Sequence, residues 1–214
     1  MGYPIPKQTG YFLEGKKQKL STPSHEFSRN KKNTLMEEYL EIIEDFENIY
    51  KSIPFIEEIY LCNSISFNAL HSESDIDLFI ITQPKRIRTA KFRAMILFFF
   101  RKSKRTLKKK KRRFCLSFFV TSDEQNLYKI SLKSIDIYLA YWIQHLVLLY
   151  KDNPEKKSLL FKKNKRIQGI LPNYPQQQSI YLENKVFTGK SKFKTTIEKL
   201  SKGIFGDGIE YLLK

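Results

Sequence analysis

Two aspartates, Asp75 and Asp77, stand one residue apart at the start of an apolar run that ends at Thr82. Side chains at positions i and i+2 of a β-strand point to the same face, so both carboxylates can reach one point in space. An unpaired charge is costly in an apolar setting, so the pair is predicted to lie at the solvated end of the strand or to meet a cation. Mg²⁺ prefers oxygen ligands, which makes both residues candidate metal ligands.

A second polar feature, Asn63-Ser64, precedes the aspartates, with ten residues between Ser64 and Asp75. It follows the apolar segment 56–62 and opens a segment, 64–72, that is predicted to form a turn or a short helix. The backbone N–H groups and the hydroxyl of a strand-to-helix turn can hold a phosphate group. A metal on the aspartates and a phosphate on this turn would together form a phosphoryl-transfer site.

The pattern CNS…SESDIDLFIIT, within residues 62–82, resembles the signature of the nucleotidyltransferase superfamily related to DNA polymerase beta. In that superfamily a Gly-Ser turn precedes Asp-x-Asp. The resemblance covers most of residues 10–173 and is strongest over 53–82. Further stretches resemble an uncharacterised prokaryotic branch of the superfamily: GYFLEGKK at 10–17, IPFIEEIYLCNS at 53–64, RIRTAKFRA at 86–94, YLAYWIQHLVLLY at 138–150 and LPN at 171–173.

The resemblance implies roles for individual residues. Asn63 takes the place of the turn glycine and Ser64 that of the phosphate-binding serine, while Asp75 and Asp77 match the catalytic, metal-binding aspartates. It implies Mg²⁺ as the cofactor and a nucleoside triphosphate as the substrate, from which a nucleoside monophosphate passes to an acceptor hydroxyl. Asparagine tolerates a left-handed backbone better than other non-glycine residues, so the turn can survive the replacement.

A third carboxylate, which active members of the superfamily carry on a later strand, is the more serious departure. The matching strand is expected at FCLSFFV, 114–120, where Ser117 occupies the acidic position. Asp123 and Glu124 follow that strand and could substitute only if the loop folds back. The alternative is a catalytically weakened nucleotidyltransferase-fold module that binds nucleic acid or a partner protein through its basic surface.

Basic residues are numerous and unevenly spread. The chain of 214 residues has a formal net charge of +17, and ten of the thirteen residues in 101–113 are Lys or Arg. This run is either a phosphate or nucleic-acid clamp or a solvated loop, and the loop is favoured because no aromatic residues interleave the charges. Arg86 and Arg88 follow the aspartate strand and could bind a triphosphate, or they could simply be solvated.

The surrounding elements predict an α+β fold with a small mixed sheet. Strands are expected at 56–62, 75–82 and 114–120, with helices at 34–51, 88–101 and 136–150 packed on them. The expected organisation is a basic N-terminal segment, 1–33, with a wing-like hairpin, a nucleotidyltransferase core, 34–150, and a basic, mainly helical extension, 151–214. That extension is expected to end in an amphipathic helix, 191–213.

Cys62 and Cys115 lie in apolar runs, which indicates reduced and buried thiols. The N-terminus lacks the apolar region of a signal peptide, and no apolar stretch reaches the roughly 18–20 residues that span a bilayer. We therefore expect a cytoplasmic protein without a membrane partner. The acceptor, the choice of nucleotide and the oligomeric state are left open.

Overall fold

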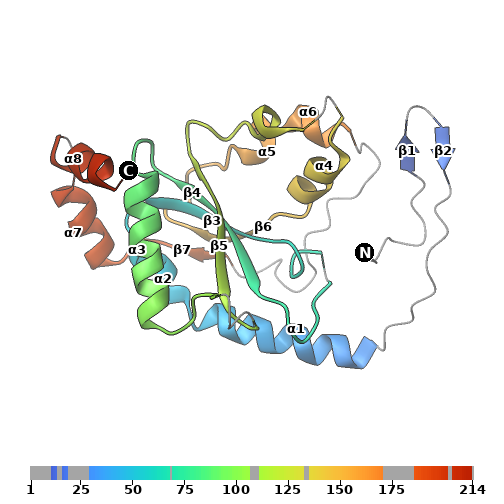
Figure 1. Cartoon of the computed structure of the whole chain (residues 1–214), viewed down its shortest axis with the longest axis horizontal. Helices are drawn as coiled ribbons and strands as arrows, with labels where there is room; N and C mark the ends of the chain where they lie inside the picture. Colours follow the sequence, from blue (N-terminus) through green and yellow to red (C-terminus); the bar gives the residue numbers. More distant parts are fainter. Residues whose placement is uncertain are drawn as a thin grey trace.

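A computed structural model describes residues 11–13, 16–18, 29–67, 69–106, 111–132, 135–170, 186–201 and 204–213. The predicted α+β class is confirmed, because helices cover both faces of a central mixed sheet (Figure 1). None of the described helices is both long and apolar enough to cross a bilayer.

The central sheet has five strands in the order β5-β4-β3-β6-β7. The predicted strands are its first three, in adjacent positions: β3, Ile56–Cys62, runs antiparallel to β4, Ile76–Thr82, which runs parallel to β5, Phe114–Thr121. Parallel neighbours need a crossover connection, and α3, Ile87–Phe100, supplies it. Every residue of β4 is buried, which explains its almost unbroken apolar sequence.

The predicted helix 34–51 is two helices. α1, Arg29–Glu44, begins five residues earlier than expected, and α2, Glu47–Ser52, follows a turn at Asp45 and Phe46. The turn lets Phe46 enter the core, where its ring stacks on Phe98 of α3 at 5.5 Å. Burial of this ring explains a break that helical periodicity alone did not indicate.

The prediction of one helix over 136–150 is wrong in its second half. α4, Ile137–Gln144, begins at Asp136, whose carboxylate accepts a hydrogen bond from the N–H of Leu139, but the chain then forms strand β6, Val147–Lys151. β6 runs antiparallel to the free edge of β3. The segment is apolar on nearly all sides, so it carries no period that distinguishes helix from strand, and the unpaired edge of β3 decides the outcome.

The core lies on both faces of the sheet. One face packs against α1, α2 and α3 through a cluster that includes Met36, Tyr50 and Phe98. The other face, which carries Tyr60, Cys62 and Phe79, packs against α4 and the short helices α5, Leu160–Lys163, and α6, Lys165–Gln168. A 3-10 turn, Leu127–Ile130, precedes α4.

The expected C-terminal helix 191–213 is also divided, into α7, Lys192–Leu200, and α8, Ile204–Leu212. A Cβ at Gly206 would lie 2.0 Å from the carbonyl oxygen of Ser201, so a glycine is needed where the two helices meet. α8 packs against α3, and Glu210 accepts hydrogen bonds from the N–H groups of Arg88 and Thr89 in the first turn of that helix.

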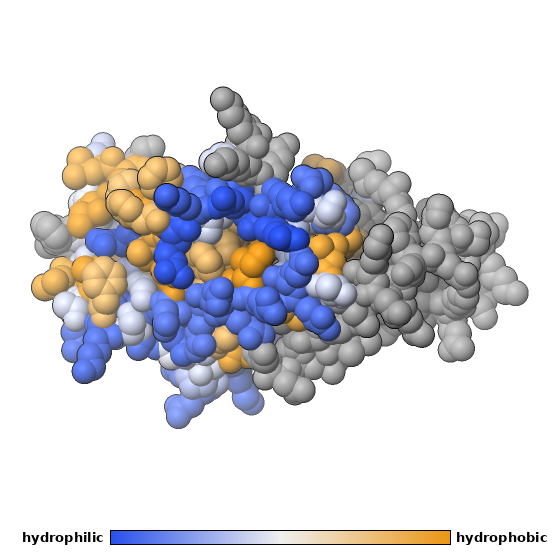
Figure 2. All heavy atoms as spheres, turned by 90° about the horizontal axis from the view of Figure 1, so that it is seen from below, coloured by the Kyte–Doolittle hydropathy of each residue, from blue (hydrophilic) through white to orange (hydrophobic). Residues whose placement is uncertain are grey.

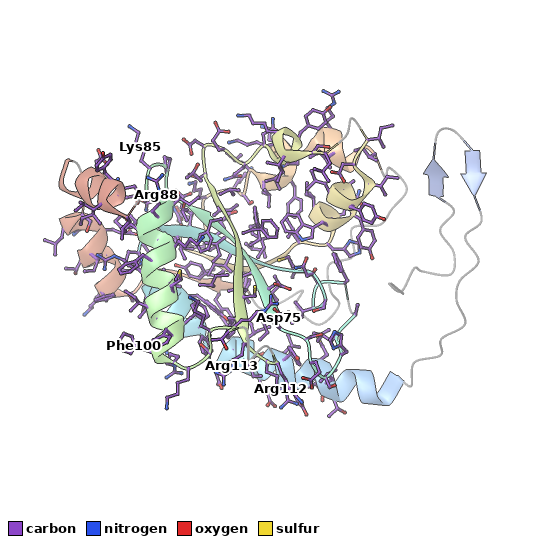
Figure 3. All side chains as sticks on the ribbon, viewed as in Figure 1. Asp75, Lys85, Arg88, Phe100, Arg112 and Arg113 are labelled. Atoms are coloured by element: carbon purple, nitrogen blue, oxygen red, sulfur yellow. The ribbon has the colours of Figure 1, made fainter. Side chains whose placement is uncertain are left out.

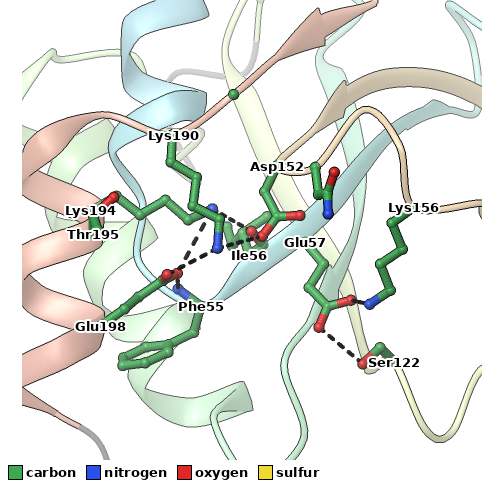
Figure 4. Close-up of polar contacts among 12 residues, drawn as sticks. Phe55, Ile56, Glu57, Ser122, Asp152, Lys156, Lys190, Lys194, Thr195 and Glu198 are labelled. Atoms are coloured by element: carbon green, nitrogen blue, oxygen red, sulfur yellow. Dashed lines mark hydrogen bonds and ion pairs between the residues drawn. The ribbon is translucent and has the colours of Figure 1, made fainter.

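A buried ionic cluster holds α7 against the sheet (Figure 4). Lys194 is fully buried and donates hydrogen bonds to the carbonyl oxygen of Ile56 and, at 3.1 Å, to the hydroxyl of Tyr150. Glu198 accepts a 2.8 Å hydrogen bond from the N–H of Phe55. Lys190 lies 3.0 Å from Asp152 and 3.1 Å from Glu198, so each carboxylate of the cluster has a cation beside it. The short strand β7, Phe187–Thr188, precedes Lys190 and pairs with β6.

The N-terminal segment contains a two-stranded antiparallel hairpin of β1, Tyr11–Leu13, and β2, Lys16–Gln18. This is the region where the hairpin is expected. Its wing-like role stays a prediction.

Candidate functional site

The three adjacent strands align a row of polar side chains near one end of the sheet. Cys62 on β3 is paired with Asp77 on β4, and Asp77 is paired with Cys115 on β5. Residues that pair in register share a face of the sheet, so all three side chains point to the α4 side. Asp75 lies two positions before Asp77, at the entrance to β4.

Asp75, Asp77 and Cys115 form a compact group, in which one ligand atom from each side chain lies within 4.8 Å of the others. Within the described part of the chain, this is the one such group of His, Cys, Asp or Glu side chains. Asp77 is buried, with 8% of its surface exposed, and Asp75 is partly buried. The predicted convergence of the two carboxylates is therefore present in the structure.

Asn63 and Ser64 lie beside this group, because the antiparallel pairing of β3 and β4 ends at Cys62 opposite Asp77. Asn63 has φ 58°, the left-handed conformation expected where the resemblance places a glycine. Its carbonyl oxygen accepts a 2.9 Å hydrogen bond from the N–H of Phe67, and its side-chain oxygen accepts one of the same length from the indole of Trp142. The turn is thus fixed from both sides, with α4 contributing Trp142.

Arg105 is a member of the site that the sequence analysis did not identify. Its guanidinium Nη1 lies 2.8 Å from Asp75 Oδ2 and donates a 3.3 Å hydrogen bond to Cys115 Sγ. The residue belongs to the basic run 101–113, for which the sequence predicts either a clamp or a solvated loop. This run therefore contributes one side chain to the aspartate site. Residues 107–110 of that run lie outside the described part of the chain.

The free acceptor capacity of Asp75 favours a cation at this position. Asp75 Oδ2 is buried and accepts no hydrogen bond, so its contact with Arg105 is an ion pair by distance only. A buried carboxylate oxygen without a hydrogen bond is unfavourable. The two carboxylates fit Mg²⁺, which usually takes one or two from the protein and completes its shell with phosphate and water. The thiol of Cys115 does not suit Mg²⁺, because sulfur is a soft ligand.

The position of the third carboxylate needs correction. Cys115, rather than Ser117, is the β5 residue paired with Asp77, and Ser117 falls where the pairing of β4 and β5 shifts between Leu116 and Phe118. The side chain of Ser117 lies outside the described part of the structure. A β-bulge moves the residues beyond it by one place, which no motif in the sequence indicates.

Asp123 and Glu124 cannot supply the missing carboxylate in this structure. They follow Thr121, which pairs with Thr82 at the far end of β4. Asp123 instead has its pKa lowered by the hydroxyl of Thr121, and Glu124 pairs with Lys129 at 2.6 Å. The loop after β5 does not fold back to Asp75.

Arg86 and Arg88 also lie away from the aspartates, because both follow the Thr82 end of β4. Figure 3 shows Arg88 and Asp75 at opposite ends of this strand. Arg86 pairs with Asp207 at 2.6 Å, and Arg88 contacts Glu210, so both residues hold α8. Their expected role in triphosphate binding is not supported by this position. The order of the residues explains this separation. Asp75 precedes β4 and Arg86 follows it, and the two ends of a seven-residue strand lie about 20 Å apart.

The two cysteines are free, as predicted. Cys62 is buried, and its pKa is raised first by burial and then by the charges of Asp77, Cys115 and Asp75. Cys115 is only partly buried, so the expectation of a buried thiol is met for Cys62 alone. Cys62 is therefore a neutral packing residue, while Cys115 is the thiol that faces the site.

The surface divides into polar and apolar regions. Figure 2 shows hydrophilic side chains around a smaller hydrophobic area in the middle of the face seen from below, with more hydrophobic side chains gathered on the left, where α3, α7 and α8 lie. Exposed hydrophobic residues on these helices include Phe99, Phe100, Phe193, Leu200 and Leu212. In the basic run, Arg101, Lys102, Lys111 and Arg112 are exposed.

Comparison with known proteins gives no family for the chain. No protein-family model, no curated protein and no solved structure matches it.

Proposed function

We propose that the chain is a Mg²⁺-dependent nucleotidyltransferase that moves a nucleoside monophosphate from a nucleoside triphosphate to an acceptor hydroxyl. The observation that carries this proposal is the convergence of Asp75 and Asp77 beside the Asn63-Ser64 turn, on one face of three neighbouring strands. The resemblance of 53–82 to the nucleotidyltransferase superfamily supports it. Two free cysteines fit a cytoplasmic location.

In this proposal each part of the site has one task. Asp75 and Asp77 would hold Mg²⁺, which neutralises charge on the phosphate groups when it is bound. The N–H groups and hydroxyl of the Asn63-Ser64 turn would hold the triphosphate. Positioning and charge neutralisation can supply most of the rate acceleration in such a transfer, because the protein contributes little covalent chemistry of its own.

Trp142 offers a direct test, because it is the single tryptophan of the chain and its indole donates to Asn63. We expect nucleoside triphosphate to change its fluorescence in the presence of Mg²⁺ and to have little effect in EDTA. Asp77→Asn should abolish the Mg²⁺-dependent change. Glu73→Gln is the matched control, because Glu73 is a nearby carboxylate that pairs with Lys111 outside the group. An unchanged response in Asp77→Asn would contradict the metal assignment.

A second candidate function is a non-catalytic module that binds nucleic acid or a partner protein. One observation favours it: in the described residues, the third side chain within ligand distance of the aspartates is the thiol of Cys115, with no further carboxylate in the group. Activity separates the two candidates. Transfer of label from an α-phosphate-labelled triphosphate to protein, RNA or small-molecule hydroxyls would support the enzyme, whereas Mg²⁺-dependent nucleotide binding without any transfer would support the module.

A further inference from the structure

We infer that Arg105 is a built-in counter-ion of the aspartate site, which holds the cation position at Asp75 until a divalent metal displaces it. The inference rests on the proposed metal binding at Asp75 and Asp77, and it adds a determinant of the metal affinity. Arg105 would then control how readily the site takes up its metal.

The first support is electrostatic. Asp75 and Asp77 bring two carboxylates within 4.8 Å of each other and of Cys115, in a largely buried place. Two like charges at such a distance disfavour the folded state unless a cation lies nearby. Arg105 is that cation, since its Nη1 lies 2.8 Å from Asp75 Oδ2 and 3.3 Å from Cys115 Sγ. A positively charged nitrogen thus lies against two of the three candidate ligand atoms.

The second support is how the backbone holds this residue. The N–H of Arg105 donates to the carbonyl oxygen of Phe114 at 2.9 Å, and the N–H of Phe114 donates to Ser103 at 2.8 Å. Lys104 forms a parallel bridge with Phe114. Phe114 is fully buried and packs against Phe46 and Phe98. The backbone of Arg105 is therefore tied to the end of β5 through a core residue, which aims the side chain at the site.

The third support is the exposure of the side chain. About a third of the Arg105 side chain is open to solvent, at 37%, whereas that of Asp75 is 19% exposed. The guanidinium consequently covers the solvent side of the carboxylate. It can move into water by side-chain rotation, with its backbone hydrogen bonds intact. A pair of this kind resists a competing cation but does not exclude it.

The test is the affinity for Mn²⁺ alone, measured from the EPR signal of the free ion in solution. We expect Arg105→Gln to bind Mn²⁺ about 3- to 5-fold more tightly than the wild type, as loss of a partly exposed ion pair predicts. Lys104→Gln removes the same charge from the adjacent residue and should stay within about 2-fold of the wild type. Asp77→Asn should abolish specific Mn²⁺ binding in either background.

Each other outcome has a distinct meaning. Wild-type binding that depends on Asp77, with no gain in Arg105→Gln, would overturn the role of Arg105 and leave the proposed metal site standing. An equal gain in Lys104→Gln would also overturn it, because a general charge effect would then suffice. Absence of any Asp77-dependent binding would overturn both. If Arg105→Gln fails to fold, Arg105→Met decides: it removes the charge and keeps the aliphatic part of the side chain, so an affinity equal to the wild type's would reject the inference.

Discussion

The two ends of strand β3 carry two charge clusters that are organised in opposite ways. At the Ile56 end, Lys190, Lys194, Asp152 and Glu198 join α7 to the sheet (Figure 4). At the Cys62 end, Asp75, Asp77 and Cys115 converge with one arginine at their solvent side. The first cluster joins a helix to the sheet, whereas the second contains a buried acceptor atom, Asp75 Oδ2, that accepts no hydrogen bond from the described residues.

This difference separates a structural cluster from a candidate functional one. In the α7 cluster, Glu198 accepts from a backbone N–H and lies beside Lys190, and Lys194 is fully buried. In the aspartate cluster, Asp75 Oδ2 is buried without a hydrogen bond. Buried polar groups are normally satisfied, so an exception next to clustered carboxylates is a reason to expect a ligand.

The largest expected effect comes from breaking the α7 cluster. Glu198→Ala should lower the free energy of unfolding by about 3–5 kcal/mol, because it removes the acceptor of the Phe55 N–H and the carboxylate that lies 4.0 Å from the ammonium group of the buried Lys194. Urea unfolding at neutral pH measures this. Glu124→Ala is the control, since Glu124 forms an exposed pair with Lys129 and should cost at most about 1 kcal/mol. Equal losses in the two variants would contradict the structural role of the cluster.

The next effect concerns pH and Lys194. Burial lowers the pKa of Lys194 from 10.5 to about 8 in the folded protein. Between these values the unfolded chain binds the additional proton, so the free energy of unfolding should rise with pH, by up to about 3 kcal/mol. Below pH 8, Lys194 is protonated in both the folded and the unfolded chain, so the cost of burying its charge lowers the free energy of unfolding in full.

Tyr60 and Tyr150 act in the opposite direction above about pH 10, because burial raises their pKa values and the unfolded chain ionises first. The measurement is therefore a comparison of the wild type with Lys194→Met in urea at pH 7, 8, 9 and 10. The rise should be present in the wild type and missing in the variant. Parallel curves would show that Lys194 does not titrate in this range.

At the aspartate end, we expect a change of opposite sign. Asp77→Asn should raise the free energy of unfolding of the metal-free protein by about 0.5–1.5 kcal/mol, because it removes one of two clustered charges at nearly constant shape. Urea unfolding in EDTA measures this, with Glu73→Gln as the exposed control. A destabilisation as large as that of Glu198→Ala would mean that both clusters are structural.

The smallest effect is expected in the basic run. Lys111 pairs with Glu73 at 3.3 Å, and both side chains are well exposed, so Lys111→Ser should change the free energy of unfolding by less than about 0.5 kcal/mol. The same variant tests the nucleic-acid candidate through the dependence of RNA binding on salt. If Lys111 contacts a phosphate of single-stranded RNA, the slope of log affinity against log salt should shrink by about 0.7. An unchanged slope would indicate a solvated loop.

The sequence alone determined the local elements with a clear signal. The strands around 56–62, 75–82 and 114–120 were predicted from apolar runs bounded by polar residues, and the left-handed Asn63 from its place in the motif. The convergence of Asp75 and Asp77 follows from the two-residue repeat of a strand. The far position of Arg86 and Asp123 could also have been anticipated, because residues that follow a strand lie at its other end.

Only the tertiary structure decided the features that depend on contacts between distant segments. β6 is a strand because the backbone groups at the edge of β3 need hydrogen-bonding partners. The sequence does not indicate this, because a wholly apolar segment has no hydrophobic periodicity that distinguishes a strand from a helix. Cys115 faces Asp77 because β5 pairs with β4 in that register, and the register shift that leaves Ser117 without a paired residue on β4 comes two residues later. Arg105 reaches Asp75 because the core residue Phe114 holds its backbone, although thirty positions separate the ion pair in the chain and nine other basic residues share its run. The sequence shows how many basic residues the run has, but only the packing of the folded chain determines that Arg105 is the one that contacts Asp75.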